Sequence, residues 1–123
     1  MKFHLQRPDG RTLISAVSEG AIVIDGERWT QPVLVWPDAA PQPLAASSFE
    51  MLATDHFEPL LAARPDVVLL GTGGRQRFAH PRLYAALTAA QIGVDCMDTA
   101  AACRTYNVLV GEDRKVVALL FPT

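Results

Sequence analysis

The chain has 123 residues, a formal net charge of −2 and a hydrophobic share of 50%. A chain of this length forms one domain, here residues 1–123, and buries about two-thirds of the surface that its unfolded form exposes. The apolar share excludes a disordered chain, and the small acidic excess argues against a general nucleic-acid-binding protein. The longest uninterrupted apolar run is Val116–Phe121, which is too short to span a bilayer.

The start of the chain predicts a protein that is not exported. Arg7 and Asp9 come before any apolar stretch, so the apolar core of a signal peptide is missing. The Arg- and Ser-rich composition of a transit peptide is missing as well. We therefore expect a bacterial-type cytoplasmic protein, or one on the matrix side of a mitochondrion if a presequence has been removed.

The first predicted elements are short strands. Thr12–Val17 and Ala21–Ile24 are β-prone runs, and the turn residues that end at Gly20 join them into a predicted hairpin. Val33–Trp36 predicts a third strand, which the following proline ends. Pro37–Pro43 contains three prolines and predicts a loop.

The next stretch predicts one main helix. Ser47-x-x-Glu50 and Asp55-x-x-Glu58 both match a capping box. Pro59 favours the second match, because proline is best tolerated in the first turn of a helix. We therefore expect a helix over Asp55–Arg64 and leave Leu44–Ala53 open between a strand and a single helical turn.

The second half of the chain alternates between strands and helices, as an α/β fold does. The predicted strands are Val67–Leu70, Gly93–Met97 and Val116–Phe121. The predicted helices run from Pro81 to Gln91 and from Asp98 to about Val110, where Gly111 ends the second one. This order requires crossover connections and a largely parallel sheet. The second helix is expected to bury a stripe made of Ala102, Tyr106 and Leu109, flanked by Ala101, Thr105 and Val108.

The glycine-rich turn Gly71–Gly74 is the sharpest local feature. It follows a buried strand at its carboxyl end, where open α/β sheets place ligands. Arg75, Arg77, His80 and Arg82 follow closely, so turn amides and cations together predict an anion site. The turn matches neither a P-loop nor a dinucleotide fingerprint. The alternative is a steric need for glycine beside a solvated arginine cluster, with His80 as an exposed loop residue.

Two further groups of polar residues are candidates. Asp98 and Thr99 are expected on the same rim of the sheet, as a base or ligand group or as a simple helix N-cap. Thr105, Tyr106 and Asn107 lie in the middle of a helix that packs on the sheet. There Asn107 would bond a loop backbone and Tyr106 would aim its hydroxyl at the rim, or both would only brace the crossover loops.

The candidate ligand-binding residues are therefore Gly71, Thr72, Gly73, Gly74, Arg75, Arg77, Asp98, Thr99, Tyr106 and Asn107.

Metal and thiol chemistry find little support. Cys96 and Cys103 lack the further ligands of a structural zinc site, and the three histidines are scattered. Cys103 lies one turn into a predicted helix, where the pKa of its thiol would be somewhat lowered, but no histidine is near it in the sequence. We expect no metal, no cofactor and no catalytic residue.

Three segments together resemble one known family: Pro65–Gly74, Gly93–Leu109 and Glu112–Leu120. It is a family of small domains of unknown function that includes the mitochondrial respiratory complex I assembly factor 3 and an adipogenesis-associated animal protein. The resemblance implies a three-layer α/β domain whose mixed central sheet has one strand antiparallel to the rest. It also implies a shared cluster of Gly71, Thr72, Gly73, Asp98, Thr99, Thr105, Tyr106 and Asn107. It implies no reaction.

Two functions follow as hypotheses. The first is a non-catalytic, assembly-factor-like protein that binds an unknown protein partner, with its oligomeric state left open. The second is a site for a small anionic ligand, or an uncharacterised enzyme, at the rim formed by Gly71–Gly74. The second requires Asp98 and either Arg75 or Arg77 to converge on one concave pocket.

Overall fold

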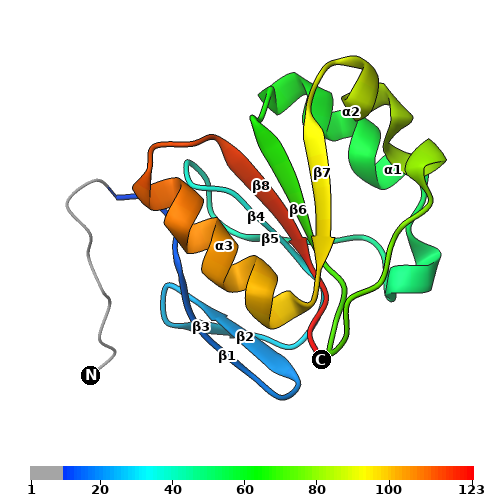
Figure 1. Cartoon of the computed structure of the whole chain (residues 1–123). Coiled ribbons are helices and arrows are strands. Elements are labelled where there is room, and N and C mark those ends of the chain that lie inside the picture. Colours follow the sequence, from blue (N-terminus) through cyan, green and yellow to red (C-terminus); the bar gives the residue numbers. More distant parts are fainter. Residues whose placement is uncertain (1–9) are drawn as a thin grey trace.

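The computed structural model describes residues 10–123, which form two β-sheets and several short helices (Figure 1). The prediction about a signal peptide concerns Met1–Asp9, which lie outside the described residues. The small sheet holds β1 (Ile14–Ser18), β2 (Ala21–Ile24) and β3 (Glu27–Trp29). The large sheet holds β4 (Val33–Val35), β5 (Gln42–Pro43), β6 (Val67–Gly71), β7 (Gly93–Met97) and β8 (Val116–Leu120).

The helices fall into two groups along the chain. Between β5 and β6 come the 3₁₀ helix η1 (Phe49–Met51), α1 (Thr54–Phe57) and the 3₁₀ helix η2 (Glu58–Ala63). Further along lie the 3₁₀ helix η3 (Pro81–Tyr84), α2 (Ala85–Ala89) and the longest helix, α3 (Thr99–Gly111). Within residues 10–123, none of these helices is long and apolar enough to cross a membrane.

The large sheet is mixed and mostly parallel, as predicted. Its strand order is β5-β4-β8-β6-β7. β6 pairs in parallel with both β7 and β8, whereas β4 pairs antiparallel with β8 and with β5. β4 therefore runs against the other four strands, which confirms what the family resemblance implied.

The molecule has three layers (Figure 1). One face of the large sheet is covered by α3 and the small sheet, and the other face by α1, η2 and α2. β8 lies in the middle, so its residues alternate between two apolar clusters: Val116, Ala118 and Leu120 face α3, and Val117 and Leu119 face away from it. All five are buried, as the continuous apolar run predicts.

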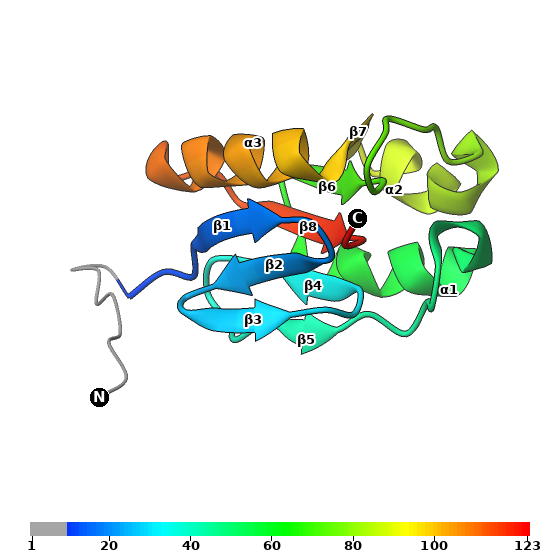
Figure 2. The same cartoon turned by 90° about the horizontal axis from the view of Figure 1, so that it is seen from below.

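The predicted hairpin is confirmed, and it continues into a strand that was not predicted. β1 and β2 pair antiparallel, and β3 adds to the far edge of β2 (Figure 2). Asp25 and Gly26 connect β2 to β3 with positive φ angles of 49° and 85°, the backbone that a tight hairpin turn needs. β3 is exposed except for Trp29 and has no apolar alternation, so only its pairing with β2 makes it a strand.

The prediction of one helix over Asp55–Arg64 is wrong, because the segment is a short α-helix followed by a 3₁₀ helix. α1 ends at Phe57, and η2 continues as a 3₁₀ helix to Ala63. Pro59 has no N–H to donate to the carbonyl of Asp55, so the α-helical ladder cannot continue through it. The segment Leu44–Ala53, for which the sequence allowed a strand or a single helical turn, contains one 3₁₀ turn, η1. Ser48 makes no side-chain hydrogen bond to cap it.

Three smaller boundaries also differ. The predicted loop Pro37–Pro43 ends in the two-residue strand β5, because β4 offers it an edge to pair with. α3 includes Gly111, and the left-handed residue beyond it is Asp113, with φ 61°. Phe121 lies just past the end of β8.

Candidate functional site

The rim predicted to hold the site forms where β6, β7 and β8 end. The Thr72 N–H donates to the carbonyl oxygen of Met97 at 2.9 Å, and the Phe121 N–H donates to that of Gly71 at 3.0 Å. The three strand ends are thus joined directly. The parallel arrangement brings the glycine turn and the start of α3 together, as the sequence predicts.

Thr99, the first residue of α3, locks the glycine turn in place. Its side chain is wholly buried, and its hydroxyl donates to the carbonyl of Phe121 at 2.6 Å and accepts from the Gly73 N–H at 2.8 Å. The Thr99 N–H donates in return to the Gly73 carbonyl at 2.9 Å. Every polar group of Thr99 that faces the turn therefore has an internal partner.

The glycines at 71 and 73 are required for different reasons. A Cβ on Gly71 would lie 2.9 Å from Cδ2 of Leu120 and 3.2 Å from Cα of Thr99. Gly73 has φ +100°, which L side chains rarely adopt. By contrast, a Cβ on Gly74 would make only ordinary contacts. Close packing and backbone geometry thus explain the first and third positions of the motif.

Thr72 organises the loop that follows the turn. Its side chain is buried, and its hydroxyl donates to the carbonyl of Arg75 at 2.6 Å and accepts from the Arg77 N–H at 3.1 Å. One hydroxyl thereby bridges both sides of the loop. This fixes the path of the chain through the arginine cluster.

Asp98 acts as the N-cap of α3. Its Oδ1 accepts a hydrogen bond from the Ala101 N–H at 2.9 Å, and the helix N-terminus favours its negative charge. This is the capping role that the sequence offered as the alternative to a base or ligand group.

The two candidate arginines differ in their surroundings. The Arg77 guanidinium pairs with the carboxylate of Glu50 and lies 4.2 Å from the ring centroid of Phe49. The hydrogen bond from Arg77 holds the pKa of Glu50 below its usual value. Arg75 is exposed, and its side chain makes no hydrogen bond or ion pair with a described residue.

A hollow of about 290 Å³ opens beside the glycine turn. Thr72, Gly73 and Arg77 line it from one side, and Ser47–Glu50 line it from another. The remaining walls come from Gly20, Thr30–Pro32 and Phe121–Thr123. Gly74, Arg75 and Asp98 do not line this hollow, so the expected convergence of Asp98 with an arginine on one pocket does not occur there.

Tyr106 and Asn107 serve the small sheet. The Tyr106 hydroxyl donates to the carbonyl of Thr12 at 2.8 Å, so of the two roles that the sequence offered it has a bracing one and does not point to the rim. The Asn107 amide accepts from the Ile14 N–H at 2.9 Å and donates to the Ile14 carbonyl at 2.7 Å. Both residues are seven or more positions along α3 from Thr99, roughly 10 Å at helical rise. Thr105 is half-buried beside them.

The buried stripe of α3 differs from the predicted one. Thr99, Ala102, Cys103, Tyr106 and Val110 are buried, while Leu109 is only half-buried. Burial raises the pKa of the Cys103 thiol to about 12, so the expected lowering is wrong. The helix N-terminus is too weak to offset the loss of solvent. Among the described residues, no three His, Cys, Asp or Glu side chains gather as metal ligands would.

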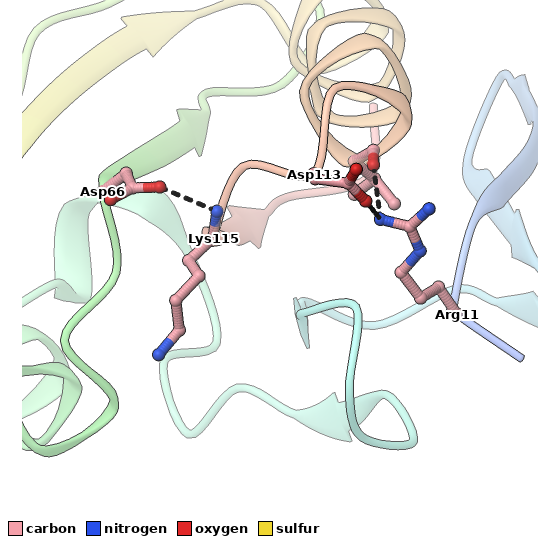
Figure 3. Close-up of polar contacts among 5 residues, drawn as sticks. Arg11, Asp66, Asp113 and Lys115 are labelled. Atoms are coloured by element: carbon pink, nitrogen blue, oxygen red, sulfur yellow. Dashed lines mark hydrogen bonds and ion pairs between the residues drawn. The ribbon is translucent and has the colours of Figure 1, made fainter. Parts of the chain in front are cut away.

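Polar contacts that the sequence did not suggest stabilise the end of the fold that lies opposite the rim, at the starts of β6 and β8 (Figure 3). Arg11 donates to the carbonyl of Val110 at 2.8 Å and to the carboxylate of Asp113 at 2.6 Å, which closes the C-terminal end of α3. Asp66 accepts from the Lys115 N–H at 2.9 Å and links the starts of β6 and β8. Arg11 and Val110 are 99 positions apart, so no local signal could have paired them.

Comparison with known proteins identifies the family to which the chain belongs. A model described as "Protein of unknown function (DUF498/DUF598)" matches residues 14–121, which contain both sheets and every helix. The chain belongs to the DUF498/DUF598 family. This membership confirms the resemblance seen in the three sequence segments.

Relatives of this DUF498/DUF598 protein carry different names. NADH dehydrogenase [ubiquinone] 1 alpha subcomplex assembly factor 3 of Xenopus tropicalis is 31% identical over 113 residues, covering 89% of this chain and 60% of the relative. A 13 kDa major membrane protein of Francisella tularensis is 32% identical over 71 residues, 58% of each chain. The chain thus spans about three-fifths of the length of these relatives.

A solved structure supports the fold. The crystal structure of a Bordetella parapertussis protein matches this DUF498/DUF598 protein with a TM-score of 0.87 at 31% identity. The match covers 92% of this chain and 97% of that one. The three-layer α/β architecture is therefore shared along nearly the whole of both chains.

Proposed function

We propose that this DUF498/DUF598 protein is a non-catalytic interaction protein, which acts as an assembly factor by binding another protein. One observation carries the proposal: three polar side chains of the predicted site, those of Thr72, Asp98 and Thr99, are engaged inside the fold. Thr72 and Thr99 bond the turn backbone, and Asp98 caps α3. The assembly-factor name of a relative that aligns with 89% of this chain at 31% identity supports the same function.

Affinity purification tests this proposal. The full chain, tagged and expressed at its native level in its own organism, is cross-linked and purified, and the bound proteins are quantified against a tag-only control. We expect the same one or few proteins to be enriched in every replicate. Enrichment of nothing beyond the control would overturn the proposal.

A second candidate function is a small anionic ligand site at the Gly71–Gly74 rim. The hollow of about 290 Å³ favours it, because Arg77, Ser47 and Ser48 are among the residues that line it. A ligand there would compete with the Glu50 carboxylate for Arg77, which is why we rank this function second. The remaining residues of the proposed site are Gly71, Thr72, Gly73, Gly74, Arg75, Asp98, Thr99, Tyr106 and Asn107.

Chemical-shift mapping distinguishes the two functions. The full chain is titrated with inorganic phosphate, a panel of nucleotides and a panel of organic acids. A ligand site predicts saturable shifts of the amides of residues 71–77 and 98–99. If these amides stay unmoved with every compound, the second function is abandoned.

The cytoplasm is the compartment that we propose. Fractionation of the native organism tests this, with the protein expected in the high-speed supernatant. Recovery in the membrane pellet after a high-salt wash would contradict the proposal.

A further inference from the structure

Phe78 is presented to solvent on a basic loop. Its side chain is 80% exposed, more than any other large hydrophobic residue in the described part of the chain. The segment from residue 74 to residue 83 contains Arg75, Arg77, His80 and Arg82 and no acidic residue. Exposed aromatic and arginine side chains are the kinds of residue that protein interfaces bury on binding.

Hydrogen bonds and burial fix the residues on both sides of Phe78, so the folded chain holds this side chain in an exposed position. The Thr72 hydroxyl bridges Arg75 and Arg77 on one side of the ring. On the other side, Ala79 is buried and Nδ1 of His80 accepts from the Arg82 N–H at 3.1 Å. Because the loop is already ordered, it loses little conformational entropy when a partner binds.

Arg77 anchors the loop to a second exposed segment. Its guanidinium pairs with Glu50 and stacks on Phe49, and Phe49 packs edge-on against Phe121 with ring centroids 6.1 Å apart. Met51, next to Glu50, is 61% exposed. Two of the three exposed large apolar side chains of the described residues, Phe78 and Met51, thus lie next in sequence to the two members of one ion pair.

The unpaired charge on the loop is positive. Glu50 neutralises Arg77, whereas Arg75 and Arg82 are exposed and their side chains make no contact with a charged described residue. Planar guanidinium groups bind carboxylates through two parallel hydrogen bonds. The charge therefore selects an acidic partner, and the ring selects one with an apolar side chain to pack against it.

We propose that Arg75, Phe78 and Arg82, together the Phe78 surface, dock an acidic protein segment that carries an apolar side chain. The proposal rests on the function proposed above and names the surface and the chemistry of the partner.

A protein segment fits the Phe78 surface better than a membrane does. Basic segments that bind anionic lipid usually carry about four to eight cations, and here two arginines are unpaired. The Glu50 carboxylate, 67% exposed, also lies at the edge of the loop, where anionic lipid would repel it.

A titration of the isotope-labelled full chain tests the proposal. The probe is a short synthetic peptide of glutamates and aspartates with one central leucine. The comparison probes are the same peptide with lysines in place of the acidic residues, the acidic peptide without leucine, and vesicles of phosphatidylserine and phosphatidylcholine. We expect saturable shifts at residues 74–83 with the first peptide and much weaker ones with the others. Equal binding of the lysine peptide, preference for vesicles, or no shift at these amides would overturn the proposal.

Matched variants test the residues. Phe78→Ser, and the double change Arg75→Glu with Arg82→Glu, should each weaken binding of the acidic peptide at least about tenfold. Val108→Ser removes another exposed apolar group, and Arg28→Glu reverses another exposed charge, and both should leave binding within about twofold. All these side chains are exposed, so the folded state should survive each change. Equal weakening by test and control variants would overturn the assignment.

The co-purification experiment separates the two proposals. Partners that bind the wild-type chain and Val108→Ser, but are lost with Phe78→Ser, would support both. If Phe78→Ser retains every partner, the Phe78 surface is wrong and the interaction function stands. If the wild-type chain enriches no partner, the interaction function itself fails.

Discussion

At the scale of single residues, Gly71 is the position of the glycine turn at which close packing leaves no room for a side chain. The hydrogen in place of its side chain lets α3 begin directly against the end of β6. We predict that Gly71→Ala lowers the free energy of unfolding by about 1–3 kcal/mol, because the added methyl meets backbone of Thr99 as well as the Leu120 side chain. Urea unfolding measures the loss.

The control for this prediction is Gly93→Ala in β7. A Cβ at Gly93 meets nothing within 4 Å, so this variant should be as stable as the wild type within about 0.5 kcal/mol. Equal losses for the two variants would show that close packing is not the reason for glycine at position 71.

Cys103 supplies a pH-dependent contribution to stability. Burial raises the pKa of its thiol from 9.0 to about 12 in the folded chain. Well below pH 9 the thiol is neutral in both the folded and the unfolded chain and does not affect stability. As the pH rises from 9 towards 12, the unfolded chain releases the proton first, so the free energy of unfolding falls. Between pH 8 and pH 10 the wild type should lose about 1.4 kcal/mol more than Cys103→Ala does.

Unfolding by urea at the two pH values measures this difference. Because Tyr and Lys titrations affect both chains alike, the comparison isolates residue 103. Parallel losses in the wild type and in Cys103→Ala would contradict the raised pKa.

At the scale of elements, one side chain takes the place of a strand. The free edge of β1 lies along α3 (Figure 2). The Asn107 amide bonds both the N–H and the carbonyl of Ile14, as a neighbouring strand would. We predict that Asn107→Ala costs about 1–3 kcal/mol, since it leaves two backbone groups without partners. Hydrogen exchange of the Ile14 amide should become faster in the same variant.

Arg104→Ala is the matched control, because Arg104 is exposed on the same helix and its side chain makes no hydrogen bond to β1. It should leave both the stability and the Ile14 exchange rate nearly unchanged. A similar acceleration in both variants would point to loosening of α3 as a whole.

Elements were predictable where a local pattern agreed with the tertiary environment. The buried runs Val67–Leu70 and Val116–Phe121 became β6 and β8, because an apolar run of this length is stable only between two covering layers. The polar strand β3 was missed, since pairing with β2 is its only stabilising feature. The helix at Asp55–Arg64 failed because Pro59 fits the first turn of a helix and equally a 3₁₀ segment.

At the scale of the whole molecule, the two sheets share one apolar cluster. Ile22 and Ile24 of the small sheet pack with Val33 and Leu69 of the large sheet and with α3. We propose that residues 1–123 fold as one domain, and we predict that the two sheets unfold in a single transition.

Single-tryptophan variants measure this cooperativity. Trp36→Phe leaves Trp29 as the reporter of β3, and Trp29→Phe leaves Trp36 as the reporter just beyond β4. The Trp29 Nε1 is buried and makes no hydrogen bond, so phenylalanine removes no bond there. The fluorescence midpoints in urea should coincide with the circular-dichroism midpoint of the same variant. A separate, earlier transition reported by Trp29 would show that the small sheet unfolds by itself.

The candidate site was predictable only in part. Strand order along the chain was enough to bring Gly71 and Thr99 to one rim, because parallel strands end on the same side. The partners of distant side chains were not predictable. Asp98 caps its own helix, which the sequence offered as an alternative, but the ion pair of Arg77 with Glu50 and the hydrogen bond of Tyr106 to Thr12 had no local signal.

The apolar share of the sequence argued against a disordered chain, and the alternation of buried runs with helices predicted the α/β class. Those properties depend on neighbours along the chain, so the sequence alone contains them. The tertiary structure decided which way β4 runs, what each polar group of the rim bonds, and that Phe78 is exposed among the arginines that follow the glycine turn. These depend on residues that are distant in sequence, and only folding brings their side chains within hydrogen-bonding distance or leaves them uncovered.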